Sequence, residues 1–206
     1  MFFARFFILS LVAGLPLLGV PCSAQAQTQT KSPFLELGST TLTPSGWAEF
    51  CQRYAGDCVS ATGRSFEISA TDANVALVYR LNKEVNHSIK PLSDMDHWHE
   101  IDRWDYAEDG FGDCEDYALL KRKMLLAAGF PPGALLITIV RDENMEGHAV
   151  LVVRMDRGDL VLDNMNDELR LWWRTPYRFV KAQSPQNPNL WVGVGPIAVR
   201  PQISSR

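Results

Sequence analysis

The sequence contains no excess of basic residues and no basic run. Its 206 residues include 20 lysines and arginines against 24 aspartates and glutamates, which gives a formal net charge of −4 at pH 7. A nucleic-acid-binding domain normally carries clustered positive charge that contacts phosphates. The mildly acidic balance therefore argues against a nucleic-acid partner.

Histidine is also scarce, with four residues in the chain. Two of them fall in a short polar group formed by His97, His99, Glu100 and Asp102. No spacing within this group fits a zinc motif well. A solvated loop is the better interpretation of the group than a metal site.

Long apolar runs are absent except at the N-terminus, where residues 6–20 are almost all apolar. Arg5 is the only charge before this run, and Ser23-Ala24-Gln25-Ala26 follows it. A charged start, an apolar middle and a small-x-small site predict a secretory signal peptide over residues 1–26. An uncleaved anchor helix is the alternative, but the run is short of the roughly 20 residues that a bilayer span needs.

Removal of that segment leaves residues 27–206, which is 206 − 26 = 180 residues. This length suits one domain with a full hydrophobic core, and the chain has no internal repeat or low-complexity block. We therefore expect a single exported domain located in the periplasm.

Three cysteines remain in this mature chain: Cys51, Cys58 and Cys114. An odd count in an oxidising compartment suggests one disulfide and one free thiol. Cys51 and Cys58 flank a Gly-Asp turn and form the predicted pair, which leaves Cys114 free. A free thiol in an exported protein suggests chemical use, with an inert buried cysteine as the alternative.

The hydrophobic pattern predicts helices in the first part of this domain and strands in the second. The expected helices cover 45–54, 71–89 (with Thr71 as N-cap) and 114–128, and a long loop covers 92–112. The expected strands cover 134–140, 148–154, 159–163, 171–173, 177–180 and 191–194. Helices followed by a mostly antiparallel sheet indicate the α+β class.

Cys114 is predicted to lie in the first turn of a helix, where the partial positive charge favours a thiolate. A thiolate is the nucleophile that acyl transfer requires. The neighbouring acids Asp113, Glu115 and Asp116 oppose this effect unless their own charge is neutralised. A small core residue on a helix is the plainer interpretation of Cys114.

His148 and Asp163 lie on two strands that the pattern joins by a hairpin. With an even-numbered turn, paired positions have an odd sum, and 148 + 163 = 311 is odd. The two side chains then share one face of the sheet, directly opposed or one pair apart. An aspartate in that place can orient a histidine and stabilise its imidazolium. A three-residue turn would place them on opposite faces.

Asp113, Glu115 and Asp116 are three carboxylates within four positions. Such oxygen clusters suit a hard cation such as calcium. Favourable acids at a helix N-terminus are the simpler explanation. Both interpretations stay open from the residues alone.

Three motifs resemble those of the bacterial transglutaminase-like cysteine peptidase family. The first is Gly-Phe-Gly-Asp-Cys-Glu-Asp-Tyr-Ala-Leu-Leu-Lys over 110–121, and the others are Gly-His-Ala-Val-Leu over 147–151 and Val-Leu-Asp-Asn over 161–164. They occur in the family's order, cysteine then histidine then aspartate. Tyr177-Arg178-Phe179 and Trp191 are similar to its C-terminal part, so the resemblance runs from about 81 to 194.

The resemblance implies a papain-like, transglutaminase-like core in which a nucleophile helix packs on an antiparallel sheet. It implies a Cys114–His148–Asp163 triad for peptide-bond hydrolysis, which needs no cofactor for the chemistry. The backbone N–H of Cys114 would be one oxyanion donor.

The resemblance also implies a calcium site at Asp113 and Glu115, with Asp116 as a third candidate ligand. Among known members are periplasmic proteases that cleave a surface adhesin and so release cells from a biofilm. This implies a protein substrate such as an adhesin, and an inner-membrane regulator as a partner.

Two alternatives remain beside the protease. The same triad serves amide hydrolysis or acyl transfer on cell-wall peptides, and the fold could also serve as a non-catalytic periplasmic binding module.

Overall fold

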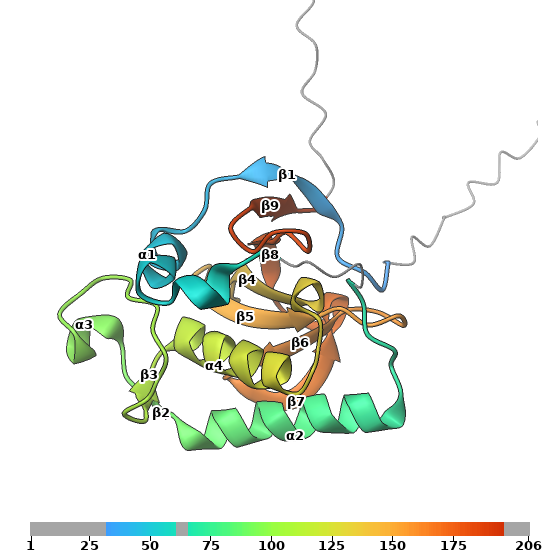
Figure 1. The fold of residues 1–206 in the computed structure, drawn as a ribbon, viewed down its shortest axis with the longest axis horizontal. Helices are drawn as coiled ribbons and strands as arrows, with labels where there is room; N and C mark the ends of the chain where they lie inside the picture. The colour runs from blue at the N-terminus through green and yellow to red at the C-terminus, as the bar shows by residue number, and fades with distance from the viewer. Residues whose placement is uncertain (1–31, 61–65, 196–206) are drawn as a thin grey trace, which may run out of the picture. The chain divides into compact units, whose positions relative to one another are not determined.

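A computed structural model describes residues 32–60 and 66–195 of the chain (Figure 1). The predicted signal peptide, residues 1–26, lies outside these ranges. Within them, no helix has the length and apolar character that crossing a bilayer requires.

The central element is a seven-stranded sheet with the strand order β1-β9-β8-β4-β5-β6-β7, in which every neighbouring pair is antiparallel. Its strands are β1 (Leu37–Thr41), β4 (Leu135–Arg141), β5 (Gly147–Val153), β6 (Leu160–Asp163), β7 (Asn166–Leu171), β8 (Arg178–Gln183) and β9 (Trp191–Val194). Two further strands, β2 (Lys90–Pro91) and β3 (Phe111–Gly112), form a short parallel pair.

Four α-helices accompany the sheet in the described residues: α1 (Ser45–Arg53), α2 (Asp72–Ser88), α3 (Asp94–His97) and α4 (Cys114–Ala127). Short 3-10 segments cover Ala55–Cys58, Pro132–Ala134 and Trp172–Arg174. Helix α4 packs on β5, and α2 packs on α4 and β7, so that α4 lies between α2 and the sheet (Figure 1).

Strand β5 is the centre of the core because all of its residues from Ala149 to Val153 are buried. Leu151 and Val153 pack in the cluster that contains the α4 residues Leu119 and Leu125. Val150 and Val152 pack in a second cluster on the other face of the sheet. A strand that is apolar on both faces belongs in the middle of a covered sheet, and this arrangement confirms the predicted α+β core.

Most predicted elements are confirmed to within two residues. Thr71 caps α2 by accepting a hydrogen bond from the Asn74 N–H at 3.2 Å. Gly129 ends α4 with a φ of +90°, a conformation that favours glycine.

Other predictions of elements were wrong. The expected strand at 171–173 is mostly a 3-10 turn, and the strand in this region is β7, from Asn166 to Leu171. Strand β7 is rich in polar residues because it lies at the sheet edge, where the described residues provide a partner strand on one side only. Strand β1 was not predicted, and the loop at 92–112 contains the short helix α3 and ends in β3.

The predicted disulfide is present between Cys51 and Cys58, and it joins the end of α1 to the following 3-10 segment. In the described part of the chain, Cys114 is the free cysteine.

Residues 33–35 are fastened to the sheet by Asp159. The Leu35 N–H donates to Asp159 Oδ2 at 2.8 Å, and the Asp159 N–H donates to the Pro33 carbonyl at 2.9 Å. Asp159 is fully buried, and Arg154 Nε lies 3.8 Å from its Oδ1. Burial raises the pKa of Asp159 from 3.8 to about 6, because the Leu35 bond and the Arg154 charge offset only part of the lost hydration.

We expect Asp159→Asn to stabilise the protein at neutral pH. A carboxylate with a raised folded-state pKa destabilises the fold where it is ionised, and the amide keeps an oxygen for Leu35. The free energy of unfolding should rise by roughly 1–3 kcal/mol near pH 7.5, and the gain should shrink as the pH falls through about 6 and vanish near about 4. Urea denaturation across this range measures it.

The control is Asp72→Asn, which neutralises an exposed aspartate. A gain that is equal at the two ends of the pH range, or a loss at pH 7.5, would contradict the account of Asp159.

Candidate active site

Cys114 is the first residue of α4, directly after Asp113 at the N-cap. The Asp113 N–H donates to Asp116 Oδ2 at 3.3 Å, which fastens the start of the helix. Gly112 is required just before it, because a Cβ there would lie 2.5 Å from Asp116 Oδ2. The local sequence thus begins a helix at the cysteine.

The Cys114 thiol has two partners from different elements. Its Sγ accepts a hydrogen bond from the Ala149 N–H of β5 at 3.3 Å, and it donates to Glu115 Oε2 at 3.0 Å. Burial raises the pKa of the Cys114 thiol well above its usual value, and the Glu115 carboxylate raises it further. The Ala149 N–H acts in the opposite direction. The thiol is therefore protonated in this arrangement.

His148 and Asp163 form a buried pair across two adjacent strands. His148 Nε2 lies 3.0 Å from Asp163 Oδ1. The register of β5 against β6 pairs Leu151 with Leu162 and Val152 with Val161, so that paired positions have the odd sum 313. The two side chains are one pair apart on the same face, as the parity argument predicts.

The connection between β5 and β6 is longer than a tight hairpin. Residues 154–159 separate the last pair, Val153 and Leu160, and this number of residues is even. The even length preserves the predicted parity.

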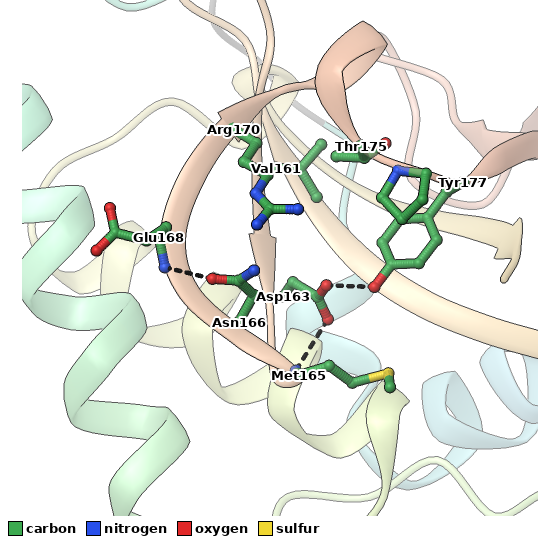
Figure 2. Close-up of a pocket in the computed structure, with 9 residues that line it drawn as sticks. Val161, Asp163, Met165, Asn166, Glu168, Arg170, Thr175 and Tyr177 are labelled. Atoms are coloured by element: carbon green, nitrogen blue, oxygen red, sulfur yellow. Dashed lines mark hydrogen bonds between the residues drawn. The ribbon is translucent and has the colours of Figure 1, made fainter. Parts of the chain in front are cut away.

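Asp163 is held by two further donors (Figure 2). The Tyr177 hydroxyl donates to its Oδ2 at 2.5 Å, and the Met165 N–H donates to its Oδ1 at 3.0 Å. Burial alone would raise the pKa of Asp163, but the bonds from His148, Tyr177 and Met165 outweigh it and keep the pKa below its usual value. Asp163 therefore stays ionised beside the imidazole.

Tyr177 was not assigned a role from the sequence, although it lies in the C-terminal motif. It follows Asp163 by 14 positions, with strand β7 between the two, and no spacing rule indicates that contact. Asp163 and Tyr177 also line a cavity of about 180 Å³ with Met165 and Arg170 (Figure 2).

Cys114 and His148 line one cleft of about 520 Å³. Glu115, Gly147 and Ala149 complete the side that holds them. The remaining lining residues come from the segment between β1 and α1, from the start of α1, from the loop before β3 and from strands β4 and β8. They are Leu42, Thr43, Pro44, Ser45, Asp102, Trp104, Ile139 and Lys181. The cleft places a thiol and an imidazole in the same accessible space.

The predicted acidic cluster is rearranged in the structure. Asp113 and Asp116 group with Asp94, and oxygen atoms of all three lie within 4.8 Å of one another. Glu115 is directed to Cys114 instead and groups with Asp113 and the thiol. The three predicted residues are thus neighbours, but they form two sets that share Asp113.

Asp94 was not predicted as a member of this cluster. The parallel pairing of Lys90 with Phe111 and of Pro91 with Gly112 closes the intervening loop. That closure places the Asp94 N–H 3.3 Å from Asp113 Oδ2. The abundance of aspartate in the loop was the only signal in the sequence.

The residues of the Asp94 cluster fit a hard cation. Burial raises the pKa of Asp94 to about 6 and that of Asp116 to about 8, and the neighbouring carboxylates add to both shifts. Asp113 Oδ1 is buried, and the described residues provide it with no hydrogen-bond partner. Concentrated buried carboxylate oxygens are the ligand set that calcium prefers.

The group His97, His99, Glu100 and Asp102 does not assemble. His97 Nε2 contacts Asp109 at 2.8 Å, His99 Nδ1 contacts the Met95 carbonyl at 3.1 Å, and Glu100 pairs with Arg103 at 3.1 Å. This agrees with the interpretation as a solvated loop.

Comparison with known proteins gives one family and a set of similar structures. The profile described as "Bacterial transglutaminase-like cysteine proteinase BTLCP" matches residues 37–198, a range that includes Cys114, His148 and Asp163. The comparison with curated proteins found no match.

Two of the similar structures are of LapG from Legionella pneumophila. The calcium-bound form has 20% identity and a TM-score of 0.50, with 76% of this chain and 86% of that chain covered. Another has 23% identity and a TM-score of 0.49, with 60% and 71% covered. At this identity, the likeness to the calcium-bound form shows the shared fold.

We expect Glu115→Gln to make Cys114 more reactive. Burial and the charge of Asp113 raise the pKa of Glu115 to about 9, so its carboxylate becomes charged in the same alkaline range in which the buried thiol ionises. Loss of that charge lowers the pKa of the thiol, so alkylation by iodoacetamide above about pH 9 should accelerate by about 10-fold. Rates measured against pH, with the label located by mass spectrometry, test this on residues 27–206.

Glu108→Gln provides the control, since it removes the same charge from an exposed position. Equal pH profiles for Glu115→Gln and the wild type would show that Glu115 does not govern the thiol.

Proposed function

The chain belongs to the bacterial transglutaminase-like cysteine proteinase family and is a cysteine peptidase, and we propose that it hydrolyses peptide bonds of an exported protein with Cys114, His148 and Asp163 as its catalytic triad. One observation carries the proposal. The thiol and the imidazole line the same cleft, and the buried Asp163 lies 3.0 Å from Nε2 of that imidazole.

Proton transfer from thiol to imidazole is the first step of the proposed reaction. Asp163 is hydrogen-bonded to His148 Nε2, so the other ring nitrogen, Nδ1, takes the Cys114 proton in the proposed reaction. The thiolate then attacks the carbonyl carbon of the scissile bond, and the carbonyl π electrons move to its oxygen. Asp163 stabilises the imidazolium because the Tyr177 and Met165 bonds keep its carboxylate ionised.

Collapse of the tetrahedral adduct breaks the C–N bond. The imidazolium gives its proton to the leaving amine, and the acyl group remains on Sγ. Water then attacks the thioester with His148 as general base, which releases the carboxylic acid and returns the proton to the thiol.

The backbone N–H of Cys114 is the proposed donor to the oxyanion. It belongs to the first turn of α4, whose N–H groups have no acceptor within the helix. These groups also carry the partial positive charge of the helix terminus, which favours a developing negative charge.

We assign the proposed calcium site to Asp94, Asp113 and Asp116, with Glu115 next to it. The buried positions of Asp94 and Asp116, and the buried Asp113 Oδ1 that has no hydrogen-bond partner in the described residues, support this assignment. When bound, the ion would supply positive charge close to the thiol. The charge of Asp113, which raises the pKa of Glu115 and of Cys114, would then be offset.

We place the protein in the periplasm. The pattern of residues 1–26 supports export, and the Cys51–Cys58 disulfide is typical of an oxidising compartment. The proposed substrate is an extended segment of a periplasmic or surface protein, such as an adhesin whose cleavage releases cells from a biofilm, and the proposed regulator is an inner-membrane protein.

The triad is tested with p-nitrophenyl acetate, a small activated ester that reports on the nucleophile without knowledge of the natural substrate. Cys114→Ala should remove turnover and acyl-enzyme, His148→Ala should reduce turnover by about 10³-fold, and Asp163→Ala by about 10²-fold. p-Nitrophenol release and the mass of acetylated Cys114 are the measurements.

His99→Ala is the matched control, since this exposed histidine bonds to the Met95 carbonyl and does not line the cleft that holds Cys114. Turnover that persists in Cys114→Ala would end the proposal. Addition of an amine acceptor separates hydrolysis from acyl transfer, because transfer gives an amide product of distinct mass.

Calcium removal should slow the enzyme and destabilise it. With calcium at about 100 times its Kd, mass action stabilises the fold by about 2.7 kcal/mol, so a chelator should lower the melting temperature and reduce p-nitrophenyl acetate turnover. Asp94→Asn should weaken both calcium responses.

Magnesium and the exposed-site variant Glu108→Gln serve as controls. A melting temperature that does not change with calcium in the wild type would remove the ion from the account and leave the triad untouched.

A further inference from the structure

Helix α2 contacts the turn that carries Asp163. This turn, residues 163–167, joins β6 to β7, and the pairing of Asp163 with Asn166 closes it. Strand β7 is the last in the sheet, so β6 is its only neighbouring strand in the described structure. Met165 at the tip of the turn is 68% exposed. The sheet therefore holds this turn from one side only.

Two asparagines of α2 bind the turn from the other side. Asn86 Nδ2 lies 2.9 Å from the Asp163 carbonyl and 2.9 Å from Asp167 Oδ1. Asn82 Nδ2 lies 3.1 Å from the Asn166 carbonyl and 3.0 Å from the Asp167 carbonyl. Asn82 and Asn86 are four residues apart and so lie on one face of the helix.

His87 adds a third contact from the same helix. Its Nε2 lies 2.9 Å from Asp167 Oδ2, so both carboxylate oxygens of Asp167 have partners on α2. Helix α2 thus binds three of the carbonyls in the turn and the carboxylate at its end.

The burial of these two amide side chains is unfavourable for the stability of the fold. Asn82 is fully buried. Within the described residues, neither Asn82 Oδ1 nor Asn86 Oδ1 has a hydrogen-bond partner. An unsatisfied buried oxygen destabilises a fold, whereas an apolar side chain would avoid this loss. The contribution of each amide therefore comes from its N–H donors. They bind carbonyl oxygens of the turn and fix the orientation of the side chain.

We propose that Asn82 and Asn86 are positioning residues for the reaction, which fix the Asp163 turn and through it the ring of His148. This inference rests on the proposed triad. The Asp163 carboxylate makes two contacts at the same time: its Oδ1 lies 3.0 Å from His148 Nε2, and its Oδ2 lies 2.5 Å from the Tyr177 hydroxyl. A displaced turn would break one or both contacts, since hydrogen bonds weaken steeply with distance and angle.

The test is turnover of p-nitrophenyl acetate by Asn86→Ala in the full mature chain with calcium present. We expect kcat to fall by about 10-fold with KM within twofold of the wild type, because the defect lies in the base and not in binding. The matched control is Asn74→Ala, which removes an amide–carbonyl bond of 2.9 Å, from Asn74 Nδ2 to the Ser69 carbonyl, at the far end of α2. It should leave kcat unchanged.

The same substitution in the Asp163→Ala background separates positioning from general destabilisation. If Asn86 acts through Asp163, Asn86→Ala should cause no further loss of kcat there. An equal loss in both backgrounds, a change confined to KM, or an unchanged kcat in Asn86→Ala would overturn the inference.

Asp167→Ala provides a second route if Asn86→Ala does not fold. It removes the bonds that Asn86 and His87 make to the Asp167 carboxylate, keeps the bond from Asn86 to the Asp163 carbonyl and leaves the helix intact. The kcat should again fall with KM preserved. Wild-type turnover in Asp163→Ala alone would refute the proposed triad instead, so the two failures are distinguishable.

Discussion

The alignment of β5 beside β6 is the constraint on which the site depends. Residues 149–153 of β5 are buried on both faces, so a slip by one position would turn His148 away from Asp163 and exchange the side chains that pack in the two core clusters. The same strand provides the Ala149 N–H that contacts the Cys114 thiol. One strand, fixed by its apolar residues, therefore positions the histidine directly and the cysteine through its backbone.

Charge is the second determinant of the site. Buried carboxylates surround the first turn of α4, and they act against the helix terminus that would otherwise favour a thiolate. Glu115 lies closest to the sulfur, while Asp94, Asp113 and Asp116 form a compact group beside it. The arrangement makes the reactivity of the cysteine dependent on whatever neutralises this group.

Local sequence patterns were sufficient for the three longer helices, for the disulfide and for most strands. Thr71, Gly129 and the two nearby cysteines act within a few residues of themselves, and such effects are visible in a linear sequence. Long-range contacts were not predictable in this way. Tyr177 meets Asp163 only after β7 has folded back on β6, and Asp94 joins Asp113 only because β2 and β3 close the loop.

The parity argument for His148 and Asp163 succeeded because side chains alternate strictly along strands, so only an even or odd turn length had to be inferred. Strand β1 was missed for the opposite reason. Its residues are polar and partly exposed, and it is ordered by pairing with β9 at the other end of the chain. No pattern near residue 37 indicates such a partner.

That pairing has a consequence for biogenesis. Strand β1 is the first strand to be synthesised, and in the described structure its one partner is β9, the last. This edge of the sheet cannot close until β9, residues 191–194, has left the ribosome. Until then β8 lacks the partner that covers its second edge, and an unpaired strand edge of this kind can pair with a strand of another chain and lead to aggregation.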